Sequence, residues 1–208
     1  MALKLAQAAS LSPVIACYIQ AYPPGVRENG GQYSHAAVWA MMAQAMTGDN
    51  DAAWASFKAI SPAHRSQHPT HGPAYELEPY VVAGDVYGAA PYTGRGGWSW
   101  YTGSAAWLHR AALETLLGLS LRQGELCLTP RVPSHWPSFE IDVKLDGKHP
   151  CDVTVRWQRA GAFDKHVEDG FNPTSKIAPG EVVRLVDLPV GARLLVQSPA
   201  DSNETLLN

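Results

Sequence analysis

The sequence has 208 residues, 46% of them hydrophobic, which is enough for one large domain or two small ones with real cores. A formal net charge of −3 and a pI near 6.2 provide no concentrated basic surface, which argues against a nucleic-acid partner. The three cysteines, Cys17, Cys127 and Cys151, have no CxxC spacing, so we expect neither a disulfide framework nor a zinc site. A reducing compartment fits this cysteine usage best.

Residues 1–20 are mildly apolar, but Pro13 interrupts them. No stretch of the sequence approaches the roughly 18 apolar residues that a membrane span needs, and the opening segment matches a signal peptide poorly. We therefore expect a cytoplasmic protein, and a longer, membrane-attached parent protein is compatible with that expectation.

Two neighbouring helices are expected first. Residues 35–48 are apolar nearly all round a helix, as in a helix buried between neighbours, and Gly48 ends the pattern. Asp49 and Asn50 are good N-caps for a second helix over residues 51–60, where apolar side chains recur at helical spacing.

Two further helices are expected after a long ordered loop. The loop covers residues 61–75, where three histidines and three prolines occur without an apolar period. Residues 78–88 predict a helix that begins near Pro79, because proline suits a first helical turn. Residues 104–118 are strongly amphipathic, with Gly118 placed to end the helix.

After Arg122 the pattern changes to short strands. Residues 139–145 alternate between apolar and polar side chains, and the Asp146–Gly147 pair that follows predicts a hairpin. Residues 160–180 are polar and predict a long connection. Other strand-like runs are ELCLT (125–129), CDVTVRW (151–157), EVVRLV (181–186) and ARLLVQ (192–197). This half therefore predicts a β-sandwich.

A polar, glycine-rich segment, YPPGVRENGGQYSH (22–35), immediately precedes the first buried helix. Polar residues at the entrance to a buried helix suggest a binding site. A capping loop is an equally good interpretation of the same residues, with Ser34 as the cap and a local ion pair between Arg27 and Glu28.

A second such segment, GRGGWSWYTGSA (94–105), places Thr102, Gly103 and Ser104 at the start of the last helix. A helix N-terminus presents unpaired N–H groups and a partial positive charge, and a glycine lets an anion approach the backbone. The segment therefore suits phosphate, and an ordinary threonine N-cap is the open alternative.

The order of these motifs resembles the end of glycoside hydrolase family 94 enzymes. ENGGQYSH is followed by EPYVVAGDVY, by GRGGWSWYTGSAAWLHRAALETLLG and by a proline-rich TPRVPSHWPSFE. The family includes cellobiose and chitobiose phosphorylases, and the sequence is most similar to the carboxy-terminal region of cyclic β-1,2-glucan synthases. The resemblance covers residues 18–157, whereas residues 1–17 and those beyond 158 do not resemble the family.

The resemblance implies an α+β chain in series, with the closing helices of an (α/α)6 barrel in residues 1–121 and a small β-sandwich in residues 122–208. It implies part of an inverting glycan phosphorylase, in the hexosyltransferase class, that uses inorganic phosphate as co-substrate without another cofactor or a metal. The expected partners are a β-glucan or β-glucoside oligosaccharide and phosphate.

By motif position, His35, Thr102 and the backbone of Gly103 resemble the phosphate ligands of the family, and Arg27 and Glu28 resemble residues that hold the acceptor sugar. A satisfied buried histidine is the alternative interpretation of His35. Three rings in the same segments suit either sugar contacts or a protein core: Tyr33, Trp98 and Trp100.

The family's general acid is an aspartate in a segment resembling GDWND, and the sequence contains no such segment. Asp85 is the aspartate of the helical half that stands away from a helix cap, but its surroundings predict a helix and not a catalytic loop. We therefore expect no catalytic acid in this chain, inactivity of the chain alone, and an N-terminal part of the enzyme as a partner.

Three other functions have some basis in the sequence. His64, His68 and His71 are close in sequence, but the prolines among them and the missing carboxylate or cysteine argue against a metal site. The β half with its aromatic residues would suit a carbohydrate-binding or scaffold module without catalysis. An ordinary (α/α)6 hydrolase would need a second carboxylate, for which Glu28 and Glu76 are the candidates.

Overall fold

The computed structural model describes residues 18–19, 21–100, 102–145, 151–160, 173, 175–184, 187–188 and 191–197. The chain divides into two compact units, Met1–Ala112 and Leu113–Asn208, and each is described by itself. The predicted boundary between residues 121 and 122 falls within a strand of the second unit. Among the described residues, no helix has the length and apolar character that crossing a membrane requires.

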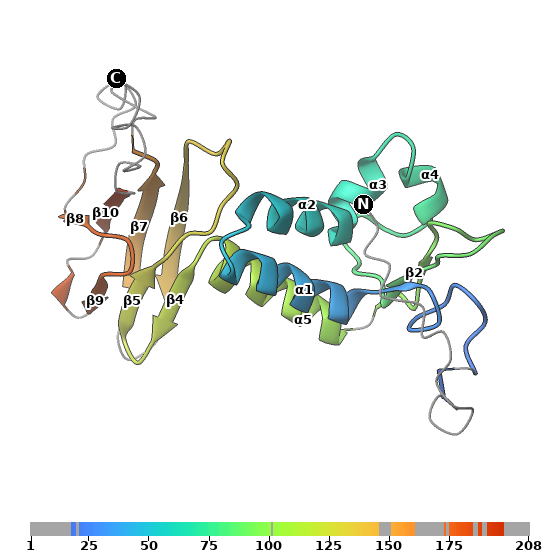
Figure 1. Cartoon of the computed structure of the whole chain (residues 1–208). Helices are drawn as coiled ribbons and strands as arrows, with labels where there is room; N and C mark the ends of the chain where they lie inside the picture. Colours follow the sequence, from blue (N-terminus) through green and yellow to red (C-terminus); the bar gives the residue numbers. More distant parts are fainter. Residues whose placement is uncertain are drawn as a thin grey trace, which may run out of the picture. The chain divides into compact units, whose positions relative to one another are not determined.

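Two helices of the first unit lie side by side (Figure 1). Helix α1 (Ser34–Met46) and helix α2 (Asn50–Ile60) pack against each other, with Val38 and Met41 fully buried on α1. The Asp49 side chain accepts a hydrogen bond of 3.2 Å from the Ala52 N–H. Both helices and the aspartate cap are therefore as the sequence predicts.

Residues 61–75 differ from the predicted loop. They form two short helices, α3 (Pro62–Gln67) and α4 (Gly72–Tyr75), and each has a proline in its first turn. The fixed φ of proline is already suited to a helix start, so the prolines that suggested a loop instead begin these helices.

The predicted helix over residues 78–88 is wrong, because this segment is extended and contains strand β2 (Asp85–Val86). All six residues from Val81 to Val86 are buried, so the segment has no solvent-facing side on which a surface helix would lie. Its backbone pairs with neighbouring chain instead: the Gly84 N–H donates to the Gly97 carbonyl at 3.0 Å.

Strand β2 is the middle of a three-stranded antiparallel sheet in the order β1-β2-β3, with β1 (Gln32–Tyr33) and β3 (Gly96–Gly97) as neighbours. Helix α5 (Thr102–Arg110) follows β3 and packs against α1. It continues as a π-helical segment, Ala111–Leu116, and Gly118 with φ +73° ends it as predicted.

The second unit consists of two sheets that share one hydrophobic core. The strands are β4 (Leu119–Arg122), β5 (Glu125–Leu128), β6 (Ser138–Leu145), β7 (Cys151–Gln158), β8 (Ser175–Ile177), β9 (Val182–Arg184) and β10 (Ala192–Gln197). One sheet has the order β6-β7-β10-β8 and the other β4-β5-β9. Strands β6 and β7 are antiparallel, whereas β10 runs parallel to β7 and to β8.

The alternation in β6 is confirmed. Phe139, Ile141 and Val143 pack into the core of the second unit. The Asp146–Gly147 turn lies outside the described residues, as does most of the predicted connection over 160–180. The described part of that connection includes β8, a short strand that the polar composition did not predict.

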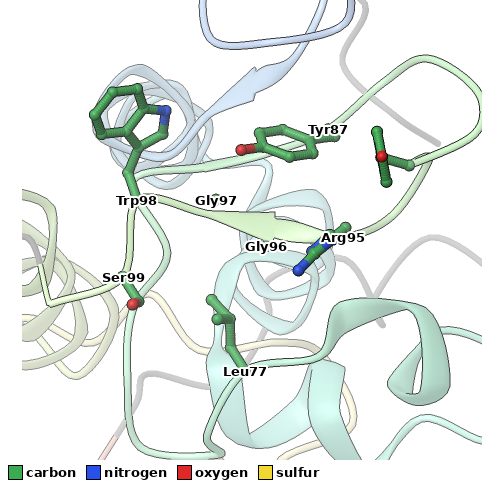
Figure 2. A pocket seen from close by; sticks show the side chains of 8 residues that line it. Leu77, Tyr87, Arg95, Gly96, Gly97, Trp98 and Ser99 are labelled. Carbon is green, nitrogen blue, oxygen red and sulfur yellow. The ribbon is translucent and has the colours of Figure 1, made fainter.

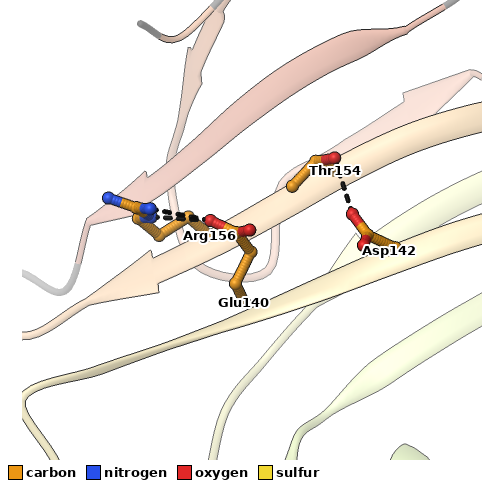
Figure 3. A network of polar contacts seen from close by, with 4 residues as sticks. All are labelled: Glu140, Asp142, Thr154 and Arg156. Carbon is orange, nitrogen blue, oxygen red and sulfur yellow. Dashed lines mark hydrogen bonds and ion pairs between the residues drawn. The ribbon is translucent and has the colours of Figure 1, made fainter. Parts of the chain in front are cut away.

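The outer face of β6 carries polar contacts to β7 (Figure 3). Glu140 pairs with Arg156 through Nε at 2.9 Å and Nη2 at 2.8 Å. Thr154 donates a hydrogen bond of 2.7 Å to Asp142 Oδ1. Cross-strand pairs of this kind stabilise the pairing of the two strands on the face away from the core.

Candidate functional site

Helices α1 and α5 begin at the same end of the first unit, next to β2 (Figure 1). The Trp107 ring on α5 lies 6.0 Å from the His35 ring and 5.6 Å from the Trp39 ring, both on α1. His35 is in the first turn of α1, and Thr102 and Gly103 begin α5. The structure therefore brings the predicted phosphate residues to two adjacent helix starts.

Among the described residues, two buried polar atoms at these helix starts have no hydrogen-bond partner: His35 Nε2 and Ser104 Oγ. Ser104 is only 5% exposed. Buried polar atoms usually have a partner, so each of these atoms is suited to a polar ligand. Gly103 is exposed, and the space around its Cα is open. The Thr102 side chain lies outside the described part of the chain.

The loop before α1 is held by its own hydrogen bonds. The Gly25 N–H donates to the Asn29 carbonyl at 2.7 Å, and the Asn29 side-chain amide donates to the Tyr22 carbonyl at 2.8 Å. Tyr33, not Ser34, occupies the N-cap position of α1, and it makes no side-chain capping bond. The capping interpretation of this segment is therefore wrong for Ser34.

Arg27 lies among three aromatic rings. Its guanidinium carbon is 4.9 Å from the ring centre of Tyr33, 5.1 Å from that of Tyr22 and 5.8 Å from that of Trp98, distances typical of cation–π contacts. Its Nε lies 3.6 Å from Glu28 Oε2, so the predicted local ion pair is present. Burial works against the charge, but Glu28 and the two tyrosines outweigh it and raise the pKa of the guanidinium.

Asp85 joins this loop to the small sheet, a role that the sequence did not predict. The side chain is 0% exposed, and its Oδ2 accepts a hydrogen bond of 2.6 Å from the Arg27 backbone N–H. This bond holds Arg27 in a left-handed conformation with φ +48°. Burial raises the pKa of the Asp85 carboxyl, although the bond to Arg27 opposes the shift.

The second oxygen of Asp85 faces a glycine. Asp85 Oδ1 has no hydrogen-bond partner within the described part of the chain, and a Cβ at Gly97 would lie 2.5 Å from it. A side chain at position 97 would therefore displace the carboxyl group that fixes Arg27. The glycines near Asp85 in the sequence could have indicated this close contact, because a backbone that approaches another group closely often requires glycine.

An open cleft of about 340 Å³ surrounds strand β3 (Figure 2). Its walls are Leu77, Tyr87, Tyr92, Arg95, Trp98 and Ser99. Trp98 connects this cleft to Arg27, because the same ring lies over the guanidinium.

The three clustered histidines are divided between two surroundings. His64 packs edge-on against Trp54 and Phe57, whereas the rings of His68 and His71 stack at 4.3 Å. Within the described ranges, no group of three or more His, Cys, Asp or Glu side chains could hold a metal ion.

Known proteins match the part of the chain that contains these residues. The cyclic beta-(1,2)-glucan synthase NdvB of Rhizobium meliloti (strain 1021) is 48% identical over 130 residues, which is 62% of this chain and 5% of that protein. An N,N′-diacetylchitobiose phosphorylase of Vibrio proteolyticus is 27% identical over 184 residues, 88% of this chain and 21% of that protein. A solabiose phosphorylase of Paenibacillus borealis is 28% identical over 116 residues, 55% of this chain and 15% of that protein.

The chain thus spans about a fifth or less of the length of these relatives. A family model described as the catalytic domain of the glycosyl hydrolase 94 superfamily matches residues 5–118. The match begins earlier than the motifs suggested. The expectation that residues 1–17 do not resemble the family is therefore wrong for residues 5–17. Because it covers more than half of the sequence, this chain belongs to the glycosyl hydrolase 94 superfamily.

Proposed function

We propose that this chain supplies the phosphate and acceptor side of an inverting glycan phosphorylase acting on β-glucans or β-glucosides. The proposal rests on two adjacent helix starts, those of α1 and α5. Each has a buried polar atom without a partner among the described residues, His35 Nε2 on α1 and Ser104 Oγ on α5. The names of the relatives, two phosphorylases and a glucan synthase, support the same class. We further propose that the first unit belongs to an (α/α)6 barrel and that the two sheets form a β-sandwich.

The helix starts suit an anion. The N-terminal ends of α1 and α5 carry partial positive charge, and Gly103 leaves room for close approach to the backbone. The His35 imidazole would donate from Nε2 to a phosphate oxygen, and the Ser104 hydroxyl would donate to another. The protein thereby holds the nucleophile in place, which is a large part of the catalysis of a two-substrate reaction.

In the proposed reaction, a phosphate oxygen forms a bond to the anomeric carbon as the bond from that carbon to the leaving oxygen breaks. The leaving oxygen takes a proton from a carboxylic acid on the opposite face, so the configuration inverts. Glu28 would accept hydrogen bonds from the acceptor sugar, and Arg27, fixed by its three rings, would donate them.

We propose that the acid comes from another part of the enzyme. Asp85 is fully buried and already holds the Arg27 N–H, so it is poorly placed to reach a glycosidic oxygen. Glu28 forms an ion pair with Arg27 at 3.6 Å, and Glu76 forms one with Arg95 at 3.3 Å. These pairings favour a phosphorylase over an ordinary hydrolase, which needs an acid and a base among such residues.

The alternative of a carbohydrate-binding module in the second unit has less support. In the described part of that unit, Trp136, Phe139 and Trp157 pack in or against the core. The large aromatic side chains that the described residues leave exposed belong to the first unit, among them Tyr80, Tyr92 and Trp98. Sugar contacts through aromatic rings are therefore better placed in the first unit.

Phosphate binding to the full chain tests the proposal. Titration of inorganic phosphate by NMR or calorimetry should show saturable binding that His35→Ala weakens about tenfold or more, as expected for a lost hydrogen bond to a charged group. His109→Ala removes an exposed histidine from the last turn of α5 and should change nothing. Equal phosphate binding by the His35→Ala variant and the parent chain would refute the phosphate site.

The missing acid is tested by activity. The chain incubated with β-glucosides and phosphate should release no sugar 1-phosphate. Release that is robust and is lost in His35→Ala would show that the chain carries its own acid.

A further inference from the structure

The cleft around β3 has no role in the function proposed above, although it adjoins that site. Its volume of about 340 Å³ lies at the lower end of the roughly 300–1,000 Å³ that is usual for small-molecule sites. It is open to solvent along one side, and Figure 2 shows side chains arranged around a strand that consists of two glycines. A ligand of one or two rings would fit this space.

The walls of the cleft combine flat rings with polar groups. Tyr92 is 56% exposed and Trp98 is 45% exposed, so each has a ring surface available to a ligand. Strand β3 presents backbone without side chains, and the Tyr87 hydroxyl points along it (Figure 2). A flat ring edged with hydroxyl groups matches such a surface, because its apolar face packs on aromatic rings while its hydroxyls reach polar groups.

The charge at the rim of the cleft argues against an anionic ligand. Arg95 lines the cleft, but its Nε lies 3.3 Å from Glu76 Oε2, and its guanidinium carbon lies 5.7 Å from the Tyr92 ring centre. The pair has no net charge, and it offers both donors and acceptors. A neutral polyhydroxylated ligand can use both, whereas a phosphate or a carboxylate would meet the Glu76 charge as well.

The cleft shares one residue with the proposed acceptor position. Trp98 belongs to both, because the residue lines the cleft and its ring centre lies 5.8 Å from the Arg27 guanidinium carbon. Arg27 in turn lies next to Glu28. A sugar chain held at Arg27 and Glu28 would therefore reach the cleft with its next unit.

From this geometry we propose that the cleft is a second sugar subsite, which binds the next unit of a neutral glucan chain through Tyr92, Trp98 and Arg95. The assignment of the adjoining acceptor position rests on the function proposed above, while the cleft itself does not use the phosphate residues. Affinity should therefore rise with chain length.

Calorimetry with the full chain and β-linked glucose oligosaccharides, from disaccharide to tetrasaccharide, tests the subsite. The longer oligosaccharides should bind more tightly, and Tyr92→Ala should reduce their affinity about three- to tenfold, the effect of one aromatic contact. Arg95→Gln should act in the same direction. Matched controls are Tyr18→Ala, which removes another exposed tyrosine, and Arg184→Gln, which breaks an exposed ion pair with Asp187 in the second unit.

The outcomes separate the two proposals. Affinity that does not depend on chain length, with intact phosphate binding, would overturn the subsite and leave the phosphate site standing. Length-dependent affinity that Tyr92→Ala abolishes, without phosphate binding, would support the subsite and overturn the phosphate site. Equal losses in Tyr92→Ala and Tyr18→Ala would also overturn the subsite.

Discussion

Replacing Asp85 should show how strongly the loop that carries Arg27 depends on one buried hydrogen bond. In Asp85→Ala the part-buried Arg27 N–H loses its acceptor at 2.6 Å, and an unsatisfied buried group costs about 1–3 kcal/mol, so the lower part of that range applies. Removal of a buried carboxyl whose Oδ1 has no partner offsets part of this cost. We expect a net loss of about 1–2 kcal/mol in the free energy of unfolding.

Asp85→Asn is the matched variant. Its amide oxygen can still accept from the Arg27 N–H, and it carries no charge in the buried site. We therefore expect a stability within about 1 kcal/mol of the parent chain at pH 7, since a neutral acceptor keeps most of a hydrogen bond.

The two variants also predict a dependence on pH. Burial raises the folded-state pKa of Asp85 above its ordinary value of 3.8, so the native state binds this proton more tightly than the unfolded state. The stability that Asp85 contributes is then full below pH 3.8 and is lost as the pH rises through the folded-state pKa. Asp85→Asn has no such proton, so the parent chain should gain stability relative to this variant as the pH falls toward 3.8.

Urea unfolding followed by tryptophan fluorescence, at pH 7 and in steps down to pH 4, measures both effects. An Asp85→Ala variant as stable as the parent chain would refute the value assigned to the hydrogen bond. A difference between Asp85→Asn and the parent chain that stays constant with pH would refute the argument from burial.

Two substitutions away from the site test the framework of each unit. Asp49→Ala removes the cap of α2 and should cost about 1 kcal/mol in urea unfolding, whereas an unchanged midpoint would contradict the capping role. Leu194 is fully buried in the core of the second unit, and Leu194→Ala should cost about 2–5 kcal/mol, seen as a lower midpoint of thermal unfolding by circular dichroism. Leu194→Met keeps most of the volume and should cost under about 1.5 kcal/mol, so equal losses in both variants would contradict a packing effect.

Local signals predicted the helices α1, α2 and α5, because apolar spacing, an aspartate cap and a terminal glycine act within a few residues of each other. The helix prediction for residues 78–88 failed because their apolar run is buried. Only contacts with distant parts of the chain distinguish a buried strand from a buried helix. Gly84 pairs with Gly97 and α1, contacts that the local sequence does not reveal.

In the candidate site, too, local features could be predicted from the sequence and contacts between distant residues could not. Motif order placed His35 and Gly103 at helix starts, and the structure brings those two starts together. The bond between Asp85 and Arg27 joins residues 58 positions apart, so no local pattern predicts it. The cleft around β3 was not predicted for a related reason. Consecutive glycines in a sequence usually indicate a turn, whereas Gly96 and Gly97 form a strand that lines the cleft.

The position of β10 between β7 and β8 has a consequence for biosynthesis. On the ribosome, β6 and β7 emerge long before Ala192–Gln197, the strand that must insert beside β7. Until then one edge of β7 is uncovered, and the described part of β8 has no partner strand. Uncovered edges can pair with other chains. Emergence of β10 from the exit tunnel should therefore protect the nascent second unit from self-association.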